Sequence, residues 1–219
     1  MHEVRTALGR FCRWPVFALI GVVSLFGLLA WAVMGQASIA AVDVQASAWL
    51  REHTGAAALR LLESVSALHA PRAILAWTGI AALVLLVRRD GAALVMLLLS
   101  VLGGASLNHV LKHSFMRPRP GMDAMAAAAS DFAFPSGHVA NATLLYGALA
   151  MVIAARSNRA DLRWGAAAFA VFMVALVAWS RVALGAHHVG DVLGGVLVGL
   201  AWLIACRPAL RASRWPKWT

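Results

Sequence analysis

Three short clusters of polar residues interrupt a mostly apolar chain. They occupy positions 112–120, 135–138 and 180–191. The residues in them that could hold or react with a ligand are Lys112, Arg119, Pro120, Pro135, Ser136, Gly137, His138, Ser180, Arg181, His187 and Asp191. Basic side chains, two imidazoles and a single carboxylate at these spacings indicate chemistry on an anion.

Three of these residues carry a permanent positive charge. Lys112, Arg119 and Arg181 would place three cations near one point, which favours an anion of high charge density. Arginine offers a planar fork that matches phosphate oxygens, whereas lysine acts as a point charge. Lys112 or Arg119 taken alone could equally be an interfacial anchor that ends a membrane span. The combination of all three predicts a phosphate site.

The second cluster has the composition of a helix start. Pro135 precedes Ser136 and Gly137, and an apolar run follows them. The first N–H groups of a helix have no intrahelical partner and lie at the positive end of the helix dipole, so they can bind a phosphate oxygen. Glycine lets the backbone approach closely because it has no side chain. We therefore expect Ser136 and Gly137 to help hold the phosphate.

The histidines and the carboxylate provide reactive groups. His187 and Asp191 are four positions apart and share one face if a helix begins near His187. The carboxylate can then accept a hydrogen bond from one ring nitrogen and leave a lone pair on the other. His138 could protonate a leaving oxygen. An oriented imidazole, a proton donor and a cationic cradle are the parts that phosphoryl transfer needs.

The composition indicates a bilayer as the solvent. The chain has 219 residues, of which 62% are hydrophobic and 13% charged, and its mean hydropathy is +0.78. A water-soluble domain has about a quarter of its residues charged. The net charge of +10 is spread over short clusters without a basic stripe, which argues against nucleic-acid binding. The two cysteines, Cys12 and Cys206, predict neither a disulfide framework nor a zinc site.

Six apolar segments predict an all-α fold, an integral membrane bundle of about six transmembrane helices. Several segments are shorter than the roughly 18–20 residues that a span requires, but flanking Trp, His, Lys and Arg can complete them at the interface. We expect a single domain over residues 1–219, with the motif region at about 108–191. The segments are Pro15–Met34, Ala73–Val87, Gly91–Leu107, Val139–Ala155, Trp164–Ser180 and Val192–Cys206.

The basic residues predict the orientation. With a cytoplasmic N-terminus, 12 of the 19 lysines and arginines fall in segments on the cytoplasmic side. The positive-inside rule favours this arrangement. All three polar clusters then face the opposite side of the membrane, at the periplasm or cell exterior, because each lies at the outer end of a span.

The segment Gly35–Ala70 between the first two spans is only moderately apolar. Within it, Leu59, Leu62 and Val65 fall at helical spacing beside two charged residues. This pattern predicts a periplasmic region with a helix that lies on the membrane surface.

The three clusters resemble the motifs of the type 2 phosphatidic acid phosphatase superfamily. This superfamily includes lipid phosphate phosphatases, bacterial acid phosphatases and vanadium haloperoxidases. Its K-x6-R-P, P-S-G-H and S-R-x5-H-x3-D patterns match here without substitution, in the same order, at 112–120, 135–138 and 180–191. The resemblance implies a bacterial membrane-integrated phosphatase, multi-pass in the cytoplasmic (inner) membrane.

The resemblance also implies a role for each residue. His187 would be the nucleophile and form a phosphohistidine, Asp191 would orient it, and His138 would act as general acid on the leaving group. The phosphate would be held by Lys112, Arg119, Ser136, Gly137 and Arg181. The family needs neither a metal nor another cofactor, and apart from Asp191 no carboxylate lies within the motifs.

The expected partners are membrane lipids and a lipid phosphate substrate. Phosphatidic acid, phosphatidylglycerol phosphate, undecaprenyl diphosphate and the phosphates of lipid A all suit such a cradle. A phosphotransferase of the same superfamily acting on lipid A is an alternative to a hydrolase, and a haloperoxidase-like vanadate site is a weaker one. An anion transporter or channel is a further alternative, although its binding groups would usually lie near the midplane. The oligomeric state is open, and a monomer is compatible with the sequence.

Several polar residues outside the motif positions are expected to be peripheral. Arg117 is interpreted as an interfacial residue, Asp131 as a solvated loop residue and His188 as a neighbour that points away from the site. His69 is interpreted as a surface residue. The G-x-x-x-G pairs 190/194 and 195/199 predict close helix packing within the bundle rather than a dimer face.

Overall fold

The computed structural model describes residues 2–35, 37–121 and 131–211, and every regular element in these ranges is helical. The elements in chain order are α1 (His2–Gly35), α2 (Ala37–Glu52), α3 (Ala56–Leu68), α4 (Pro71–Val87), α5 (Gly91–Leu98), the π-helix η1 (Leu99–Gly103), α6 (Gly104–Phe115), α8 (Gly137–Arg156), α9 (Ala160–Ala183), α10 (Val189–Cys206) and the 3₁₀-helix η2 (Arg207–Arg211).

Among the described residues, five helical stretches are long and apolar enough to cross a membrane. They are Trp14–Gly35, Gly91–Phe115, Gly137–Arg156, Ala160–Ala183 and Val189–Leu210. A sixth span results if α3 and α4, which are bent by 59° relative to each other, count as one. The all-α membrane bundle predicted from the sequence is thus confirmed, with five or six spans.

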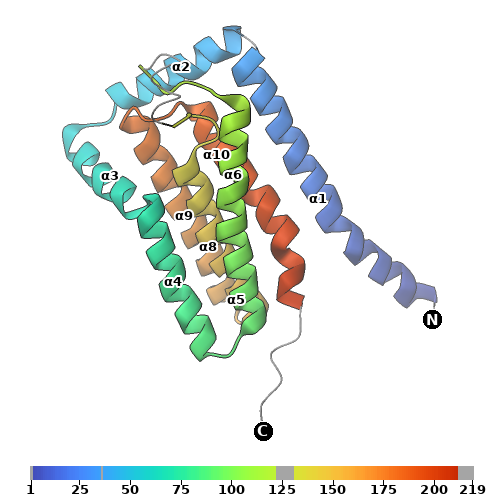
Figure 1. Cartoon of the computed structure of the whole chain (residues 1–219). Coiled ribbons are helices and arrows are strands. Elements are labelled where there is room, and N and C mark those ends of the chain that lie inside the picture. Colours follow the sequence, from blue (N-terminus) through green and yellow to red (C-terminus); the bar gives the residue numbers. More distant parts are fainter. Residues whose placement is uncertain (1, 36, 122–130, 212–219) are drawn as a thin grey trace.

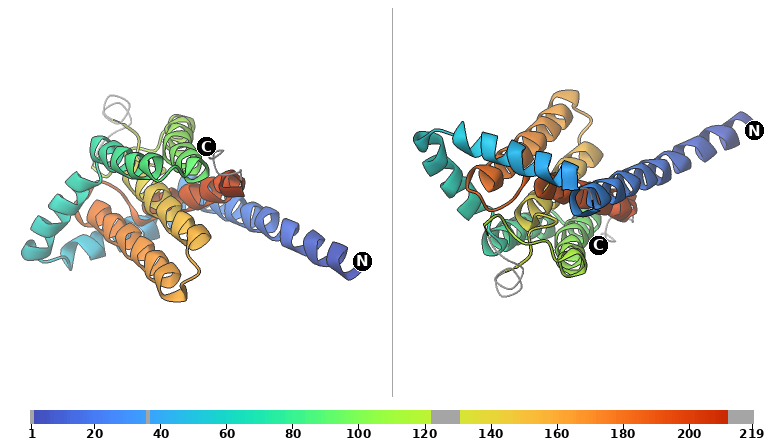
Figure 2. Two further views of the ribbon diagram at one scale, coloured as in Figure 1. Left: turned by 90° about the horizontal axis from the view of Figure 1, so that it is seen from below. Right: turned by 90° about the horizontal axis from the view of Figure 1, so that it is seen from above.

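The bundle is assembled around α8. This helix packs against α9 and α10 most extensively and also contacts α4, α5 and α6. Figure 1 shows α6 ending, α8 and α10 beginning, and α9 ending at the same end of the bundle, beneath α2. Helix α1 packs against α10, and its N-terminal half leaves the bundle, as both views in Figure 2 show. The chain segments that carry the three polar clusters therefore meet at one end.

The outward faces of the spans are apolar. Large side chains such as Trp14, Phe17, Leu83, Trp164 and Val171 are more than half exposed. In water such a surface would be costly, whereas in a bilayer it is the expected contact with lipid tails.

The region between the first two spans contains the predicted helix and a second one. Leu59, Leu62 and Val65 lie on α3, which continues at an angle into α4, while α2 lies across the end of the bundle in Figure 1. His69 was expected at the surface, but it is buried. Its ring nitrogens have partners there, the Val65 carbonyl oxygen at 2.7 Å and the Tyr146 hydroxyl at 2.8 Å. The periplasmic location of this region stays a prediction.

Close packing fixes the chain around the start of α8. Phe134, fully buried, stacks on Phe26 of α1 and meets Phe115 of α6 edge-on, with ring centroids 5.6 and 5.1 Å away. A Cβ at Gly194 would lie 2.5 Å from the Phe134 ring, and one at Gly195 would lie 2.6 Å from the Ser136 carbonyl oxygen. The glycines of α10 therefore serve close helix packing, as predicted.

Candidate active site

A cavity of about 440 Å³ lies at the end of the bundle where the three clusters meet. Its walls contain residues of the first, second and third clusters together with polar residues from their neighbourhood. The lining residues are Pro71, Ala105, Asn108, His109, Lys112, Arg119, Asp131, Gly137, His138, Asn141 and His187. Three chain segments that are separate in the sequence thus form one site.

His187 lies in the short connection between α9 and α10 and is only 1% exposed. Its backbone N–H donates to the Arg181 carbonyl oxygen at 3.2 Å, which ties the histidine to the end of α9. Burial lowers the pKa of His187 to about 4, although the nearby Asp191 carboxylate acts in the opposite direction. The imidazole is therefore neutral at neutral pH and keeps a lone pair for bond formation.

Asp191 lies in the first turn of α10 and is completely buried. One of its carboxylate oxygens, Oδ2, is 3.6 Å from Nδ1 of His187, and the same oxygen accepts the His188 backbone N–H at 2.8 Å. The four-residue spacing thus places the carboxylate beside the imidazole as expected. At 3.6 Å the contact with His187 is longer than a hydrogen bond, and His187 Nδ1 has no hydrogen-bond partner among the described residues.

The start of α8 closes another side of the cavity. Ser136 precedes the helix, and its backbone N–H donates to the Asp191 carbonyl oxygen at 2.9 Å. Its hydroxyl oxygen is buried without a hydrogen-bond partner among the described residues. Gly137 and His138 form the first turn, where helical N–H groups have no intrahelical acceptor. Donors at a helix start thus adjoin the imidazole of His187.

Lys112 and Arg119 converge on one carboxylate in this structure. Lys112 Nζ contacts Asp131 Oδ2 at 2.5 Å, and an Arg119 guanidinium nitrogen lies 3.0 Å from the same oxygen. Burial alone would raise the pKa of Asp131, but the hydrogen bonds and charges of Lys112 and Arg119 lower it below its usual value. Asp131 is a loop residue with a side chain that is 40% exposed, as expected, but two cations also hold it as a carboxylate at the cavity wall.

Arg181 is bound differently from the other two cations. Its guanidinium donates to the Ser66 hydroxyl of α3, and its Nε is buried without a partner among the described residues. It forms no ion pair with an acidic side chain of residues 14–35, 38–121 or 131–210, while its charge acts on both His138 and His187. A half-buried cation whose described hydrogen-bond partner is neutral is well suited to bind an anion.

Arg117 lies in a place that the sequence analysis did not predict. We expected an interfacial residue, but the side chain is only 10% exposed and bridges Asp191 at 2.6 Å and Asp43 at 2.8 Å. Burial opposes the charge of Arg117, yet the two carboxylates raise its pKa above the usual value. His188, whose side chain was expected to point away from the site, does not line the cavity, but its backbone N–H donates to Asp191. Asp43, 74 positions before Arg117, had no role in the sequence analysis.

Two asparagines of the cavity were also missed. The Oδ1 atoms of Asn108 and Asn141 are buried without a hydrogen-bond partner among the described residues. Asn108 precedes Lys112 by one helical turn, and Asn141 follows His138 by three positions. This spacing was a usable signal, because it places each amide on the same helix face as a motif residue.

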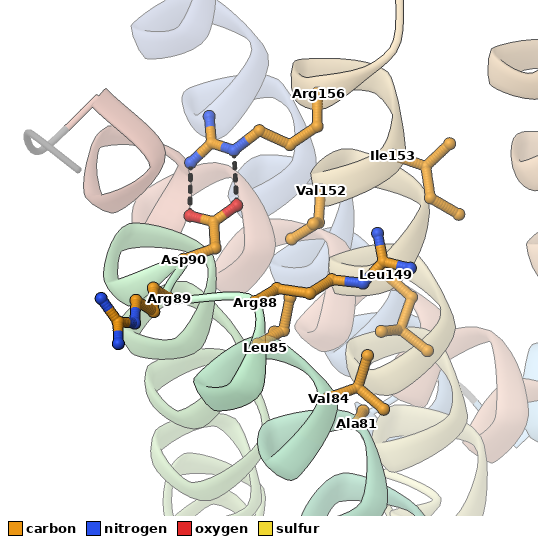
Figure 3. A pocket seen from close by; sticks show the side chains of 10 residues that line it. All are labelled: Ala81, Val84, Leu85, Arg88, Arg89, Asp90, Leu149, Val152, Ile153 and Arg156. Carbon is orange, nitrogen blue, oxygen red and sulfur yellow. Dashed lines mark hydrogen bonds and ion pairs between the residues drawn. The ribbon is translucent and has the colours of Figure 1, made fainter. Parts of the chain in front are cut away.

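A second pocket lies at the opposite end of the bundle. It has a volume of about 590 Å³ and lies between α4 and α8. In Figure 3, Arg156 of α8 forms a two-pronged ion pair with Asp90, while apolar residues such as Val84, Leu85 and Val152 form the wall. Of the residues that line it, none is a histidine, cysteine or serine, so this larger pocket does not offer the groups that phosphoryl transfer requires.

Comparison with known proteins gives the family. A sequence model of the PAP2 superfamily matches residues 93–215. The chain belongs to the PAP2 superfamily. The matched residues include all three polar clusters, so the resemblance noted from the motifs is confirmed.

Two individual proteins from Bacillus subtilis are similar to this member of the PAP2 superfamily. Phosphatidylglycerophosphatase B of strain 168 is 39% identical over 98 residues, which are 43% of this chain and 46% of the relative, so the match spans less than half of that protein. The crystal structure of a transmembrane PAP2 type phosphatidylglycerolphosphate phosphatase superposes with a TM-score of 0.79 at 24% identity. The superposition covers 90% of this chain and 98% of the other, and it shows a shared multi-pass membrane fold.

Proposed function

We propose that this membrane protein is a phosphatase that removes a phosphate from a lipid phosphate or diphosphate through a phosphohistidine on His187. The observation that carries the proposal is the buried imidazole of His187, with Asp191 beside its Nδ1, in the wall of a cavity that also presents Lys112 and Arg119. An anion drawn into this cavity by the cations meets a nucleophile that has kept its lone pair.

In the proposed first step, Nε2 of His187 attacks phosphorus while Asp191 lies beside Nδ1. The N–P bond forms, the P–O bond to the leaving group breaks, and its electron pair goes to the leaving oxygen. His138 gives that oxygen a proton. The negative charge of the bound phosphate offsets the cations around His138 and so favours its protonated form only with substrate in place.

In the proposed second step, water attacks the phosphohistidine. The water oxygen forms a bond to phosphorus, the N–P bond breaks, and its electron pair returns to the imidazole of His187. His138, now neutral, takes a proton from the water. Lys112, Arg119, Arg181, the Ser136 hydroxyl and the Gly137 N–H would hold the phosphate oxygens in both steps. No metal or other cofactor is required by this scheme.

The names of the two Bacillus subtilis proteins favour phosphatidylglycerophosphate as the substrate. Phosphatidic acid, undecaprenyl diphosphate and lipid A phosphates share the same head-group chemistry and belong in the test. Purified protein in detergent should release phosphate from this panel in the presence of EDTA. Vanadate should inhibit it because a trigonal-bipyramidal vanadate mimics the transition state. Activity lost in EDTA and restored by a divalent ion, or transfer to a lipid acceptor instead of water, would contradict metal-independent hydrolysis.

We further propose that the site faces the outside of the cytoplasmic membrane, because the basic residues lie mostly in the segments at the opposite end. Glu63 of α3 and Arg163 of α9 are both exposed and suit a topology test. Glu63→Cys should react with a membrane-impermeant thiol reagent in intact cells, and Arg163→Cys only after permeabilisation. The reverse pattern would overturn the orientation.

A further inference from the structure

A chain of three buried charges runs from α2 to the start of α10, behind the His187–Asp191 pair. The Arg117 guanidinium donates to Asp191 Oδ1 at 2.6 Å through one terminal nitrogen and to Asp43 Oδ2 at 2.8 Å through the other. The side chains of Arg117, Asp43 and Asp191 are only 10%, 6% and 0% exposed. Although Arg117 lies between Lys112 and Arg119 in sequence, it contacts carboxylates rather than the cavity wall.

Stability alone is a poor explanation for such a chain. Burying three charges costs solvation free energy, and well-packed apolar side chains often replace buried ion pairs without loss of stability. The two carboxylates and one guanidinium also leave one negative charge in excess in a buried place. An arrangement of this cost at the back of a reactive histidine suggests that the charges act on that histidine.

Asp43 fixes the position of the helix that carries Asp191. Its Oδ1 accepts the Gly190 backbone N–H at 2.7 Å, while its Oδ2 holds Arg117. One turn along α2, the Ser47 hydroxyl accepts the Val189 N–H at 3.0 Å. A Cβ at Gly190 would lie 2.9 Å from Asp43 Oδ2, so α2 approaches α10 as closely as a glycine allows. Helix α2 therefore holds the first turn of α10 in place.

Arg117 fixes the carboxylate itself. Its bond to Oδ1 and the His188 N–H bond to Oδ2 hold the two Asp191 oxygens from different sides, so the carboxylate plane has little freedom. The remaining contact of Oδ2 is the 3.6 Å approach to His187 Nδ1. Any rotation of the carboxylate changes this approach directly.

We propose that Arg117 and Asp43 are positioning residues that set the orientation and the effective charge of Asp191 toward His187. This inference rests on the proposed role of His187 as nucleophile. Arg117 attracts the Asp191 charge from the side away from the imidazole, so that the carboxylate orients His187 without drawing a proton onto it. Asp43 keeps Arg117 in this place and anchors the helix start.

A pH profile reports this effect because several charges face His187. Asp191 of α10 favours the protonated form of His187, while Arg181 of α9 and Arg119, which follows α6, oppose it. Without Arg117, the full Asp191 charge acts on the imidazole, and the pKa of His187 rises from its value of about 4. Since only the neutral imidazole attacks, the acidic limb of kcat/KM moves to higher pH.

The test compares Arg117→Met and Arg117→Lys with Arg60→Met. Arg60 is exposed on α3, so its replacement is a matched control. With an aryl phosphate, Arg117→Met should lower kcat by about 30- to 100-fold with KM changed less than about threefold, and raise the acidic limb by about one pH unit. Arg117→Lys keeps the charge but not the forked guanidinium. It should lower kcat by about tenfold and shift the acidic limb of kcat/KM less than Arg117→Met does. Arg60→Met should stay within about twofold of wild type.

A double-mutant cycle separates positioning from mere folding. If Arg117 acts through Asp191, Arg117→Met should lower kcat by less than about threefold when it is introduced into the Asp191→Asn protein. Asp43→Asn should reduce kcat by about tenfold, also only when Asp191 is present. The inference is overturned if Arg117→Met lowers kcat by the same factor in the wild-type and Asp191→Asn proteins. It is also overturned if Arg117→Met leaves the acidic limb of the kcat/KM profile at its wild-type pH. An active His187→Ala protein would instead contradict the proposed function, whatever the Arg117 variants do.

Discussion

The two ends of the helical bundle both contain arginine and aspartate, yet they use them differently. At the end between α4 and α8, Arg156 and Asp90 form a two-pronged pair at 2.7 and 2.9 Å, and Asp90 also caps α5 through the Ala93 N–H. Their side chains are 26% and 17% exposed. Both charges are matched in place, which suits a contact that ties two helices together.

At the other end Lys112 and Arg119 are more deeply buried than Arg156, with side chains 7% and 20% exposed, and the charges are less evenly matched. Arg181 rests on the hydroxyl of Ser66, and Lys112 shares Asp131 with Arg119. The cations at this end therefore retain the capacity to bind an anion, whereas Arg156 and Asp90 neutralise each other. On the proposed mechanism, the larger of the two cavities is not the reactive one, because the chemistry would depend on unmatched charge and on His187.

After loss of the proposed nucleophile itself, the largest effect is expected for His138, the proposed proton donor. His138→Ala should lower the rate on a lipid monoester by about 10³-fold, because an alkoxide of high pKa departs poorly without a proton. The same variant should lose less than about tenfold on p-nitrophenyl phosphate, whose leaving group departs unprotonated. Parallel assays of the wild-type and His138→Ala proteins measure the loss of rate on each of the two substrates. Equal losses on both would remove His138 from the general-acid role.

Activity should depend on the shape of the Arg181 side chain, which donates to the Ser66 hydroxyl. Arg181→Lys keeps the charge but loses the fork that can bind two phosphate oxygens, so kcat/KM should fall by about 30- to 100-fold. Turnover is to be measured on phosphatidylglycerophosphate in mixed micelles, with thermal unfolding as the control for folding. A variant with near-wild-type turnover would show that Arg181 anchors α9 to α3 and does no more.

The carboxylate in the cavity should compete with the phosphate. Asp131 occupies Lys112 and Arg119, and its lowered pKa keeps it ionised at neutral pH. Asp131→Asn should therefore tighten inhibition by inorganic phosphate by about three- to tenfold at pH 7. As pH falls and Asp131 takes up a proton, the difference between variant and wild type should shrink. Weaker inhibition in the variant would mean that Asp131 holds the two cations in a binding geometry.

The smallest effect on activity is expected at the opposite end. Arg156→Met breaks the pair with Asp90, which is partly exposed, so the free energy of unfolding should fall by about 1 kcal/mol or less. Turnover should change by less than about twofold. Activity and thermal unfolding in the same detergent check both numbers. A loss of turnover comparable to that of Arg181→Lys would show that the two ends are coupled.

The sequence was sufficient for the parts of the site that depend on local spacing. His187 and Asp191 are one helical turn apart, and each cluster lies at the end of an apolar run, so counting spans placed all three at one end. Arg117 and Asp43 could not be found in this way. They meet across 74 positions, and Asp43 lies in a segment whose mixed polarity resembled a surface helix. Long-range contacts between single charges leave no periodic signal in one sequence.

In the fold, too, local patterns could be predicted from the sequence and long-range contacts could not. The span count followed from hydropathy, which reports the solvent around a helix and is nearly independent of tertiary contacts. The position of α2 over the bundle depends on contacts such as those of Asp43 and Ser47 with the start of α10. Hydropathy did not predict the bend between α3 and α4 either. The sequence predicted a helix in this region but not what it would contact.

The most direct test of the account is to trap the phosphorylated enzyme. Wild-type protein mixed with a ³²P-labelled aryl phosphate and quenched within milliseconds should carry an acid-labile label, as expected for a phosphohistidine. His187→Ala should carry none and should be inactive on every substrate, since no leaving group removes the need for a nucleophile. His138→Ala should retain the label and accumulate more of it, because its hydrolysis lacks a base. Label in the His187→Ala protein, or an acid-stable label in the wild type, would contradict the assignment of His187.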